Sequence, residues 1–302
     1  MRTIKGKISW TDILNPAEED IEFLKKKFDF HPLILKELTQ PSPQIRIENF
    51  ESYLFIVYHV PVYDPDSKTS RKAEIDFIIT KDHLISIHYE PLQQIDGLYS
   101  KLLSDKELQE KVLKETTLVA LHHIFGRMIA FSMRQLRHIE EKIAMLTHES
   151  VANSKEELLL RLGYVKRDIL DYRLVTGTQE KFFENLRKIG SEFWGIKSKV
   201  YLADLENENN PVHRNINNYL EIVESLEQTN AQLLNLESNE IIKKFTVGAF
   251  LFSIPFFFVF LQGIPYISQF TLASALHFWL AASFVILVVF VIGMILRKKG
   301  LL

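Results

Sequence analysis

Two long apolar runs near the end of the chain dominate its pattern of hydrophobic and polar positions. Phe245–Leu261 holds no charged residue, and neither does Thr271–Leu296. A helix needs about 20 mostly apolar residues to cross the hydrocarbon core of a bilayer, and inside lipid it satisfies its own backbone hydrogen bonds. We therefore predict transmembrane helices over 245–264 and 272–296. The alternative, a core hairpin of a soluble protein, is disfavoured because uncharged runs this long are typical of membrane spans.

The charges that flank these runs predict their orientation. Lys243 and Lys244 precede the first run and residues 297–299 are all basic, whereas the connecting segment has no Lys or Arg. Basic residues favour the cytosolic side of a membrane. We expect an outer loop at 265–271, a basic cytosolic tail at 297–302, and both termini in the cytosol. The chain then spans the cytoplasmic membrane of the cell twice.

Residues 1–104 have the mixed pattern of an α/β domain. The segments "SYLFIVYHVPVY", "EIDFIITKD" and "HLISIHY" are rich in β-branched and aromatic residues and bounded by turn residues, which is typical of strands. The segment "PAEEDIEFLKKKF" opens with proline and acids and ends with lysines, as an amphipathic helix does. Strands with helices packed on them predict an α/β layer domain on the cytosolic side.

The pattern becomes helical from residue 105 onward. We predict a long helical hairpin over 105–210 and a stalk helix over 211–244, which begins at Pro211 and continues into the first span. Apolar residues of this stalk recur at alternating spacings of three and four, which favours packing against other long helices. From residue 212 to the outer membrane face, such a helix is about 75 Å long. The alternative is a separate membrane helix that starts at Asn239.

Composition and charge exclude several classes of protein. The 302 residues carry a formal net charge of −2, so the chain lacks the global basic field that nucleic acid requires. It has no cysteine, which removes disulfides, thiolate metal sites and cysteine nucleophiles. No two histidines have the i, i+4 spacing of a helical zinc site, and the sequence lacks the phosphate-loop, nucleophile-elbow and dinucleotide motifs. We therefore do not expect an enzyme.

Four segments, in order along the chain, resemble the CorA family of divalent metal-ion transporters: "FHPLILKEL", "IENFESYLFIVYHV", "VYLADLENEN" and "SNEIIKKFTVGAFLFSIPF". Each is weak alone, but their order and spacing cover nearly the whole chain. The resemblance implies a CorA-like fold, in which a cytosolic α/β domain, a long helical stalk and two C-terminal transmembrane helices assemble as a homopentamer in a lipid bilayer. It also implies that divalent cations are the partners, with Mg²⁺ as the transported ion and as a possible regulatory ligand.

The family's hallmark at the outer end of the first span is Gly-Met-Asn. Counting from the matched Asn239 without a gap places Gly263, Ile264 and Pro265 on this motif, with Gln262 just before it. Proline has no side-chain acceptor and no backbone donor, so it cannot replace an asparagine that holds a hydrated ion. The resemblance makes these four residues the selectivity mouth, where Gln262 or backbone carbonyls of Gly263 and Ile264 could replace the lost amide. The alternatives are a helix-ending proline, a turn glycine and an interfacial glutamine.

The resemblance also implies a pore lining and a cytosolic regulatory metal site. Glu37 and Asp204 stand where the family binds a regulatory divalent cation between neighbouring subunits, although Lys36 replaces a common glutamate there. The alternative is that both are ordinary solvated acids. Residues of the first span and the stalk end face the pore axis in the family, or else pack helix against helix, and they are Asn239, Ile242, Phe245, Thr246, Ala249, Ser253 and Phe256.

The altered mouth leaves three functions open. The first is Mg²⁺ transport, which the resemblance favours. The second is transport of another divalent cation, such as Zn²⁺, Co²⁺ or Ni²⁺. The third is a non-conducting membrane scaffold or regulator that kept the fold and lost the filter. Pro265 distinguishes them, because only a transporter should respond when that residue is changed to asparagine.

Overall fold

The computed structural model describes residues 1–66, 69–149, 155–271 and 274–300. The chain forms two compact units, residues 1–227 and residues 228–302. Each unit is described by itself, and the long helix α8 (Lys199–Leu261) contributes residues to both.

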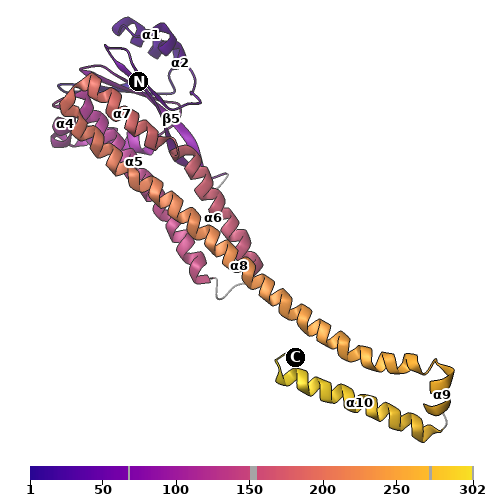
Figure 1. Ribbon diagram of the computed structural model, residues 1–302. Coiled ribbons are helices and arrows are strands. Elements are labelled where there is room, and N and C mark those ends of the chain that lie inside the picture. The colour runs from indigo at the N-terminus through magenta and orange to yellow at the C-terminus, as the bar shows by residue number, and fades with distance from the viewer. Residues whose placement is uncertain (67–68, 150–154, 272–273, 301–302) are drawn as a thin grey trace. The chain divides into compact units, whose positions relative to one another are not determined.

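A six-stranded sheet forms the centre of the first unit, with the strand order β1-β2-β6-β5-β4-β3. Strands β2 and β6 pair in parallel, and every other neighbouring pair is antiparallel. The α/β domain expected from the sequence is therefore confirmed (Figure 1). The strands are β1 (Arg2–Lys5), β2 (Ser9–Leu14), β3 (Arg46–Asn49), β4 (Leu54–Asp64), β5 (Thr69–Ile79) and β6 (His83–His88).

Both faces of this sheet are covered, because successive side chains of a strand point to opposite faces. Phe55, Val57 and Ile78 face a smaller core built with helices α1 (Glu18–Lys27) and α2 (Pro32–Glu37). The other face meets the long helices in a larger core. Five aromatic rings at its centre lie within 6.0 Å of at least one neighbouring ring, and they belong to Tyr58, Phe77, Phe125, Phe182 and Phe183.

The region predicted as one helical hairpin, 105–210, is divided among several helices. The turn after α6 requires glycine at position 177, because an added Cβ would lie 2.8 Å from the carbonyl oxygen of Arg173. The helices of this half of the unit are α3 (Gln93–Ser104), α4 (Lys106–Leu113), α5 (Thr117–Glu149), α6 (Lys155–Thr176) and α7 (Gln179–Trp194), with a short 3₁₀ turn at Ile196–Ser198 before α8.

The prediction that Pro211 begins the stalk helix is wrong. Helix α8 begins at Lys199 and contains Pro211 in its interior. An interior proline removes one backbone hydrogen bond and costs roughly 3 kcal/mol. The buried seam that offsets this cost starts before the proline, since Leu202, Leu205 and Val212 are all fully buried. The expected continuity into the apolar run is present, because α8 passes through Asn239 without interruption.

The second unit contains the end of α8, the short helix α9 (Pro265–Thr271) and helix α10 (Ala275–Lys298). Helices α8 and α10 are long and apolar enough to cross a membrane, and no residue of either apolar window is buried in the chain. The segment predicted as an outer loop, 265–271, is helical. The first apolar helix also ends at Leu261 rather than at residue 264.

Candidate ion pathway and buried polar network

One face of α8 carries all the residues predicted to line a pore. Every one of them is exposed in the single chain, and the Phe245 side chain is 79% exposed. At about 100° per residue, they occupy roughly one third of the helix circumference. They are Asn239, Ile242, Phe245, Thr246, Ala249, Ser253 and Phe256.

The half-buried residues of the same stretch lie on the opposite side of α8, at Val247, Leu251, Ile254 and Phe258. Helix α10 has a matching half-buried row, which includes Ala281, Val285, Ile292 and Leu296. The two helices therefore cover each other on these rows. The row of predicted pore residues has no cover within the described chain.

The chain turns sharply between α8 and α9. The amide N–H groups of Gln262, Gly263 and Ile264 each donate to the carbonyl oxygen three residues earlier, over 3.0 to 3.1 Å. Gly263 suits this tight turn, because an added Cβ would lie 3.3 Å from the carbonyl oxygen of Phe260. Pro265 does not terminate α8 but is the first residue of α9, a position where a missing N–H removes no helical bond.

The carbonyl groups at this turn differ in their partners. The oxygen of Ile264 accepts from the N–H groups of Ile267 and Ser268, both over 3.0 Å. Within the described chain, no group donates to the oxygen of Gly263. Of the two carbonyls predicted to be able to face a pore, only that of Gly263 is therefore available. Residues 262–271 contain no carboxylate, so backbone and side-chain amides or hydroxyls supply the oxygens here.

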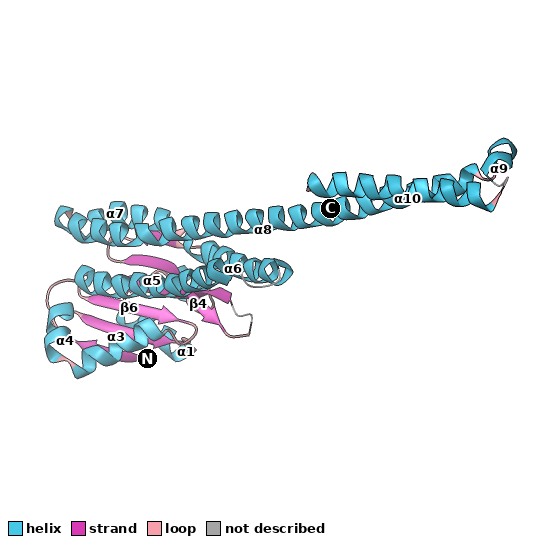
Figure 2. Cartoon of the chain, turned by 90° about the horizontal axis from the view of Figure 1, so that it is seen from below, coloured by secondary structure: helices cyan, strands magenta, loops and turns pink. Residues whose placement is uncertain are grey.

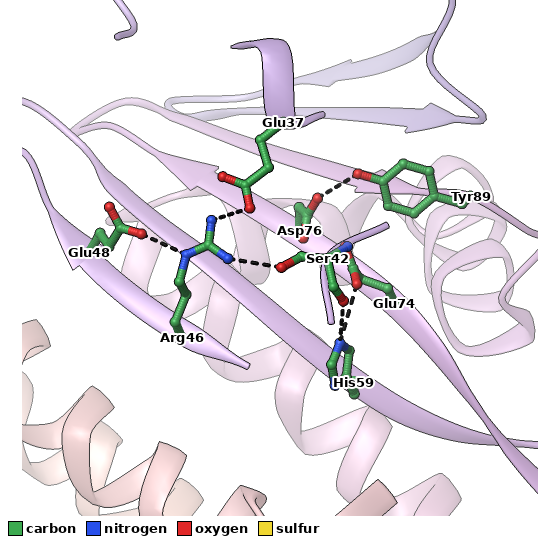
Figure 3. A network of polar contacts seen from close by, with 8 residues as sticks. All are labelled: Glu37, Ser42, Arg46, Glu48, His59, Glu74, Asp76 and Tyr89. Atoms are coloured by element: carbon green, nitrogen blue, oxygen red, sulfur yellow. Dashed lines mark hydrogen bonds and ion pairs between the residues drawn. The ribbon is translucent and has the colours of Figure 1, made fainter. Parts of the chain in front are cut away.

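In the first unit, Glu37 at the end of α2 is held by a basic side chain. Arg46 of β3 donates from Nη2 to Glu37 and from Nε to Glu48 over 2.6 Å, while its Nη1 donates to Ser42 Oγ over 2.9 Å (Figure 3). Burial opposes the charge of Arg46, but the bonds to Glu37 and Glu48 outweigh it and raise the arginine pKa. The Glu37 carboxylate is thus already neutralised inside its own domain.

Two further carboxylates lie beneath this pair on β5. Glu74 accepts from Ser42 N over 2.7 Å and faces His59 Nε2 at 3.2 Å. Asp76 accepts from the phenol of Tyr89 over 2.8 Å through Oδ2, whereas its buried Oδ1 has no hydrogen-bond partner (Figure 3). Burial, and then the charge of Glu74, raises the pKa of Asp76 well above its usual range. Its surroundings therefore favour the protonated form of Asp76.

Asp204, the second predicted regulatory ligand, lies on α8 and has a different partner. Its Oδ2 is 2.9 Å from His122 Nε2 of α5. The described residues contain no group of three or more side chains arranged to hold a metal ion. Glu37 and Asp204 do not fit a divalent cation within one chain, since each carboxylate already has a basic partner.

The sequence did not reveal Arg46, His122, Asp76 or Tyr89 as parts of these clusters. One signal was present, because the alternation of β5 places Glu74 and Asp76 on the same face as the apolar Ile78. Two acids on the core-facing side of a strand indicate a buried polar network. The partners of those acids come from elements distant in sequence, which no local pattern connects.

Comparisons with known proteins identify the family and support the fold. The family model described as CorA-like Mg²⁺ transporter protein matches residues 5–298. The chain belongs to this family. A protein of Methanocaldococcus jannaschii named cobalt/magnesium transport protein CorA is 20% identical over 97% of this chain and 91% of its own length. The solved structure of the M. jannaschii CorA magnesium transporter has a TM-score of 0.83, with 19% identity over 98% of this chain and 92% of that one.

A longer relative in Schizosaccharomyces pombe, named for metal ion transport, is 22% identical over 79% of this chain. The chain spans 41% of that relative's length, against 91% of the M. jannaschii protein. Membership of the CorA-like family makes the chain a membrane protein of metal-ion transport, with α8 and α10 as its apolar helices. The structural likeness confirms the expected α/β domain, long helix and two C-terminal apolar helices.

Proposed function

We propose that this chain forms a homopentameric channel that carries Mg²⁺ across the cytoplasmic membrane, with both termini in the cytosol. The exposed row on α8 carries the proposal. The predicted pore residues are uncovered in the single chain, and they lie opposite the half-buried row of α8. Copies of α8 arranged around an axis would bury this row and leave α10 on the lipid side.

The row divides into a polar entrance, a narrow apolar section and a mixed middle. Asn239 supplies a ring of amides at the stalk end, and Ile242 and Phe245 supply bulky apolar rings directly beyond it. Hydrophobic constrictions of this kind close a channel by excluding water. Thr246, Ala249 and Ser253 leave more room, and Phe256 narrows the path again near the mouth.

The mouth itself works without an asparagine. In a symmetric assembly, the free carbonyls of Gly263 form a ring of oxygens, and Gln262 adds an amide beside it. Mg²⁺ gives up its water shell reluctantly, so oxygens that accept from bound waters suit the capture of the hydrated ion. Ile264 and Pro265 shape the turn that presents Gly263, and neither acts as a side-chain ligand.

The regulatory site of Glu37 and Asp204 stays a proposal of an intersubunit site. A cation that bridges neighbouring copies must first displace Arg46 from Glu37 and His122 from Asp204. This competition predicts a weaker regulatory site than one built from unpaired carboxylates. The altered mouth also supports a second candidate, a CorA-like scaffold that does not conduct.

Uptake into proteoliposomes that contain a Mg²⁺-sensitive dye tests the function. We expect the wild type to admit Mg²⁺, and we expect Pro265→Asn to change the rate or the preference among Mg²⁺, Co²⁺, Ni²⁺ and Zn²⁺. Leu287→Ala, at an exposed position in the middle of α10, is the matched control. An intact pentamer that admits none of these ions would leave the scaffold as the function.

A further inference from the structure

Basic side chains from both apolar helices gather at one level of the second unit. Two lysines of α8 directly precede its apolar run, and three basic residues follow the apolar run of α10. Lys243 Nζ donates to the carbonyl oxygen of Gly300 over 2.7 Å, so α8 and the end of α10 lie side by side here (Figure 2). The basic cluster consists of Lys243, Lys244, Arg297, Lys298 and Lys299.

The charge of this basic cluster is not neutralised within the described chain. All five residues are exposed, and none of them forms an ion pair with a described acid. The second unit contains only two acids, Glu237 and Glu240, although the whole chain carries a formal net charge of −2. The bond from Lys243 to a carbonyl oxygen leaves the charge of its ammonium group in place. The basic cluster is therefore a positive patch on a slightly acidic protein.

The two lysines of α8 lie away from the predicted pore row. At about 100° per residue, Lys243 and Lys244 lie on either side of the half-buried row of α8, each roughly 50° from its centre. That half-buried row is opposite the predicted pore residues. In an assembly with the pore residues at the axis, both lysines would therefore face outward, away from the ion path.

The helix dipole accounts for only part of the basic cluster. Arg297 and Lys298 lie in the last turn of α10, where a positive charge complements the dipole. Lys243 and Lys244 lie well inside α8, which continues to Leu261, and the dipole acts only within the first and last turns of a helix. The position of these two lysines therefore calls for a negative partner of another kind.

Exposed apolar side chains border the basic cluster on both helices. Ile241 is 64% exposed and lies three residues before Lys244 on α8. Ile295 of α10 is 50% exposed and lies four residues before Lys299. Residues three or four apart share a helix face, so each helix presents a positive charge next to an apolar side chain. A soluble anion would use only the charge, whereas a lipid has both an anionic headgroup and acyl chains.

We propose that the basic cluster binds the phosphate headgroups of anionic membrane lipids, with their acyl chains along the exposed apolar residues of α8 and α10. Lysines and arginines beside a membrane helix attract anionic headgroups, and phosphate oxygens accept charge-assisted hydrogen bonds from both. Because two helices contribute donors at one level, they can hold a single headgroup between them. The proposal rests on the placement of α8 and α10 in a bilayer. It does not require ion conduction, so it and the proposed function can fail separately.

Spin-labelled lipids added to phosphatidylcholine bilayers that contain the full-length protein test this proposal. Electron paramagnetic resonance separates labelled lipid held at the protein from labelled lipid in the bulk. It counts both leaflets, so the orientation of the protein does not affect the result. At low ionic strength, we expect phosphatidylglycerol to associate roughly threefold or more in preference to phosphatidylcholine. The double variants Lys243→Gln, Lys244→Gln and Arg297→Gln, Lys298→Gln should each lower this preference roughly twofold or more.

The matched control is the double variant Lys181→Gln, Lys188→Gln, which removes two exposed lysines of α7 in the first unit. It should keep the wild-type preference. Equal association of the two lipids with the wild type would overturn the proposal, as would an equal loss of preference in the control. An unchanged preference in both cluster variants would also overturn it.

The wild type alone decides the matter if the cluster variants fail to assemble. Its preference should fall toward that of an uncharged surface at about 1 M salt, which screens exposed charges. A preference that persists at this salt concentration would show that the basic cluster is not its source.

Glycerophosphoglycerol, the headgroup of phosphatidylglycerol without acyl chains, distinguishes a lipid site from a site for soluble phosphate esters. Added in equal amount to the labelled lipid, it should leave the preference unchanged, because it lacks the part that contacts the apolar side chains. Displacement of the labelled lipid by this compound would overturn the lipid proposal and assign the basic cluster to soluble anions.

Discussion

The phenol of Tyr89 donates a hydrogen bond of 2.8 Å to Oδ2 of Asp76, while Oδ1 of the same carboxyl is buried without a partner. Asp76 is 1% exposed, and the first unit encloses it on the side of the sheet that faces α2. Burial and then the charge of Glu74 raise the pKa of this carboxyl, because ionisation would place an unsolvated charge beside Glu74. Ionisation of Asp76 therefore makes the stability of the domain depend on pH.

We expect Asp76→Asn to make the protein more stable at neutral pH. Burial and then the charge of Glu74 raise the folded-state pKa of Asp76 above the ordinary value of an aspartate. Its contribution to stability is therefore fully present below about pH 4 and is lost as the pH rises toward the folded pKa. Where the pKa of a group differs by one between the folded and the unfolded chain, the free energy of unfolding changes by about 1.4 kcal/mol across the titration. Asparagine preserves the acceptor for Tyr89 and cannot ionise.

Thermal unfolding of the full-length protein between pH 4 and pH 9 measures this effect. The Tm of Asp76→Asn should be similar to that of the wild type at pH 4 and should exceed it increasingly at higher pH. Asp66→Asn, on an exposed turn, is the control and should run parallel to the wild type. A gap between Asp76→Asn and the wild type that is constant across pH would show that Asp76 does not titrate with folding.

Arg46 should control the affinity of the proposed regulatory site. Because Arg46 competes with a cation for Glu37, Arg46→Gln should lower the internal Mg²⁺ concentration that half-inhibits uptake, by roughly three- to tenfold. Glu37→Gln should raise it. Uptake assays at graded internal Mg²⁺ give both values.

The control for this competition is Arg71→Gln, since Arg71 of β5 forms a similar pair with Glu90, which follows the end of β6. It should leave the half-inhibitory concentration unchanged. If Arg46→Gln and Arg71→Gln behave alike, Glu37 is not a regulatory ligand, and the Glu37–Arg46 pair is only structural.

The sequence predicted the class of each region well because periodicity is a local property. The strands of the first unit and the two apolar helices have patterns that are legible over ten to twenty residues. Helix boundaries at prolines were misread. Pro211 lies inside α8, in a stretch whose seam is buried on both sides of it, whereas Pro265 is the first residue of α9, where its missing N–H removes no helical bond.

The candidate sites were predictable only as single residues. The family resemblance pointed to Glu37 on α2. No local sequence pattern shows that Arg46 on β3 forms an ion pair with the Glu37 carboxylate. The same holds for Asp204 and His122, which are 82 residues apart. Pairings of this kind depend on how the strands and helices pack, which the pattern of one segment does not contain.

The predicted orientation can be read directly because the chain has no cysteine, so a single introduced thiol reports without background. Gln269→Cys, on α9, should react in intact cells with a membrane-impermeant maleimide. Lys299→Cys should react only after the membrane is permeabilised. Reaction of Lys299→Cys in intact cells would contradict the proposed topology. Each variant is compared with itself before and after the membrane is permeabilised, so a difference in folding between the two variants cannot produce this result.

Gly263→Ala should reduce transport by at least tenfold without preventing assembly. An added Cβ would lie 3.3 Å from the carbonyl oxygen of Phe260, so the turn must open by a few tenths of an ångström, and the proposed ring of Gly263 carbonyls would move with it. The matched control is Gly248→Ala on α8, where an added Cβ has no described atom within 4 Å. This control should keep the wild-type rate. Uptake is measured for both variants at equal pentamer content. Equal rates for Gly263→Ala and Gly248→Ala would show that the turn at Gly263 only connects two helices and that its carbonyls do not bind the ion.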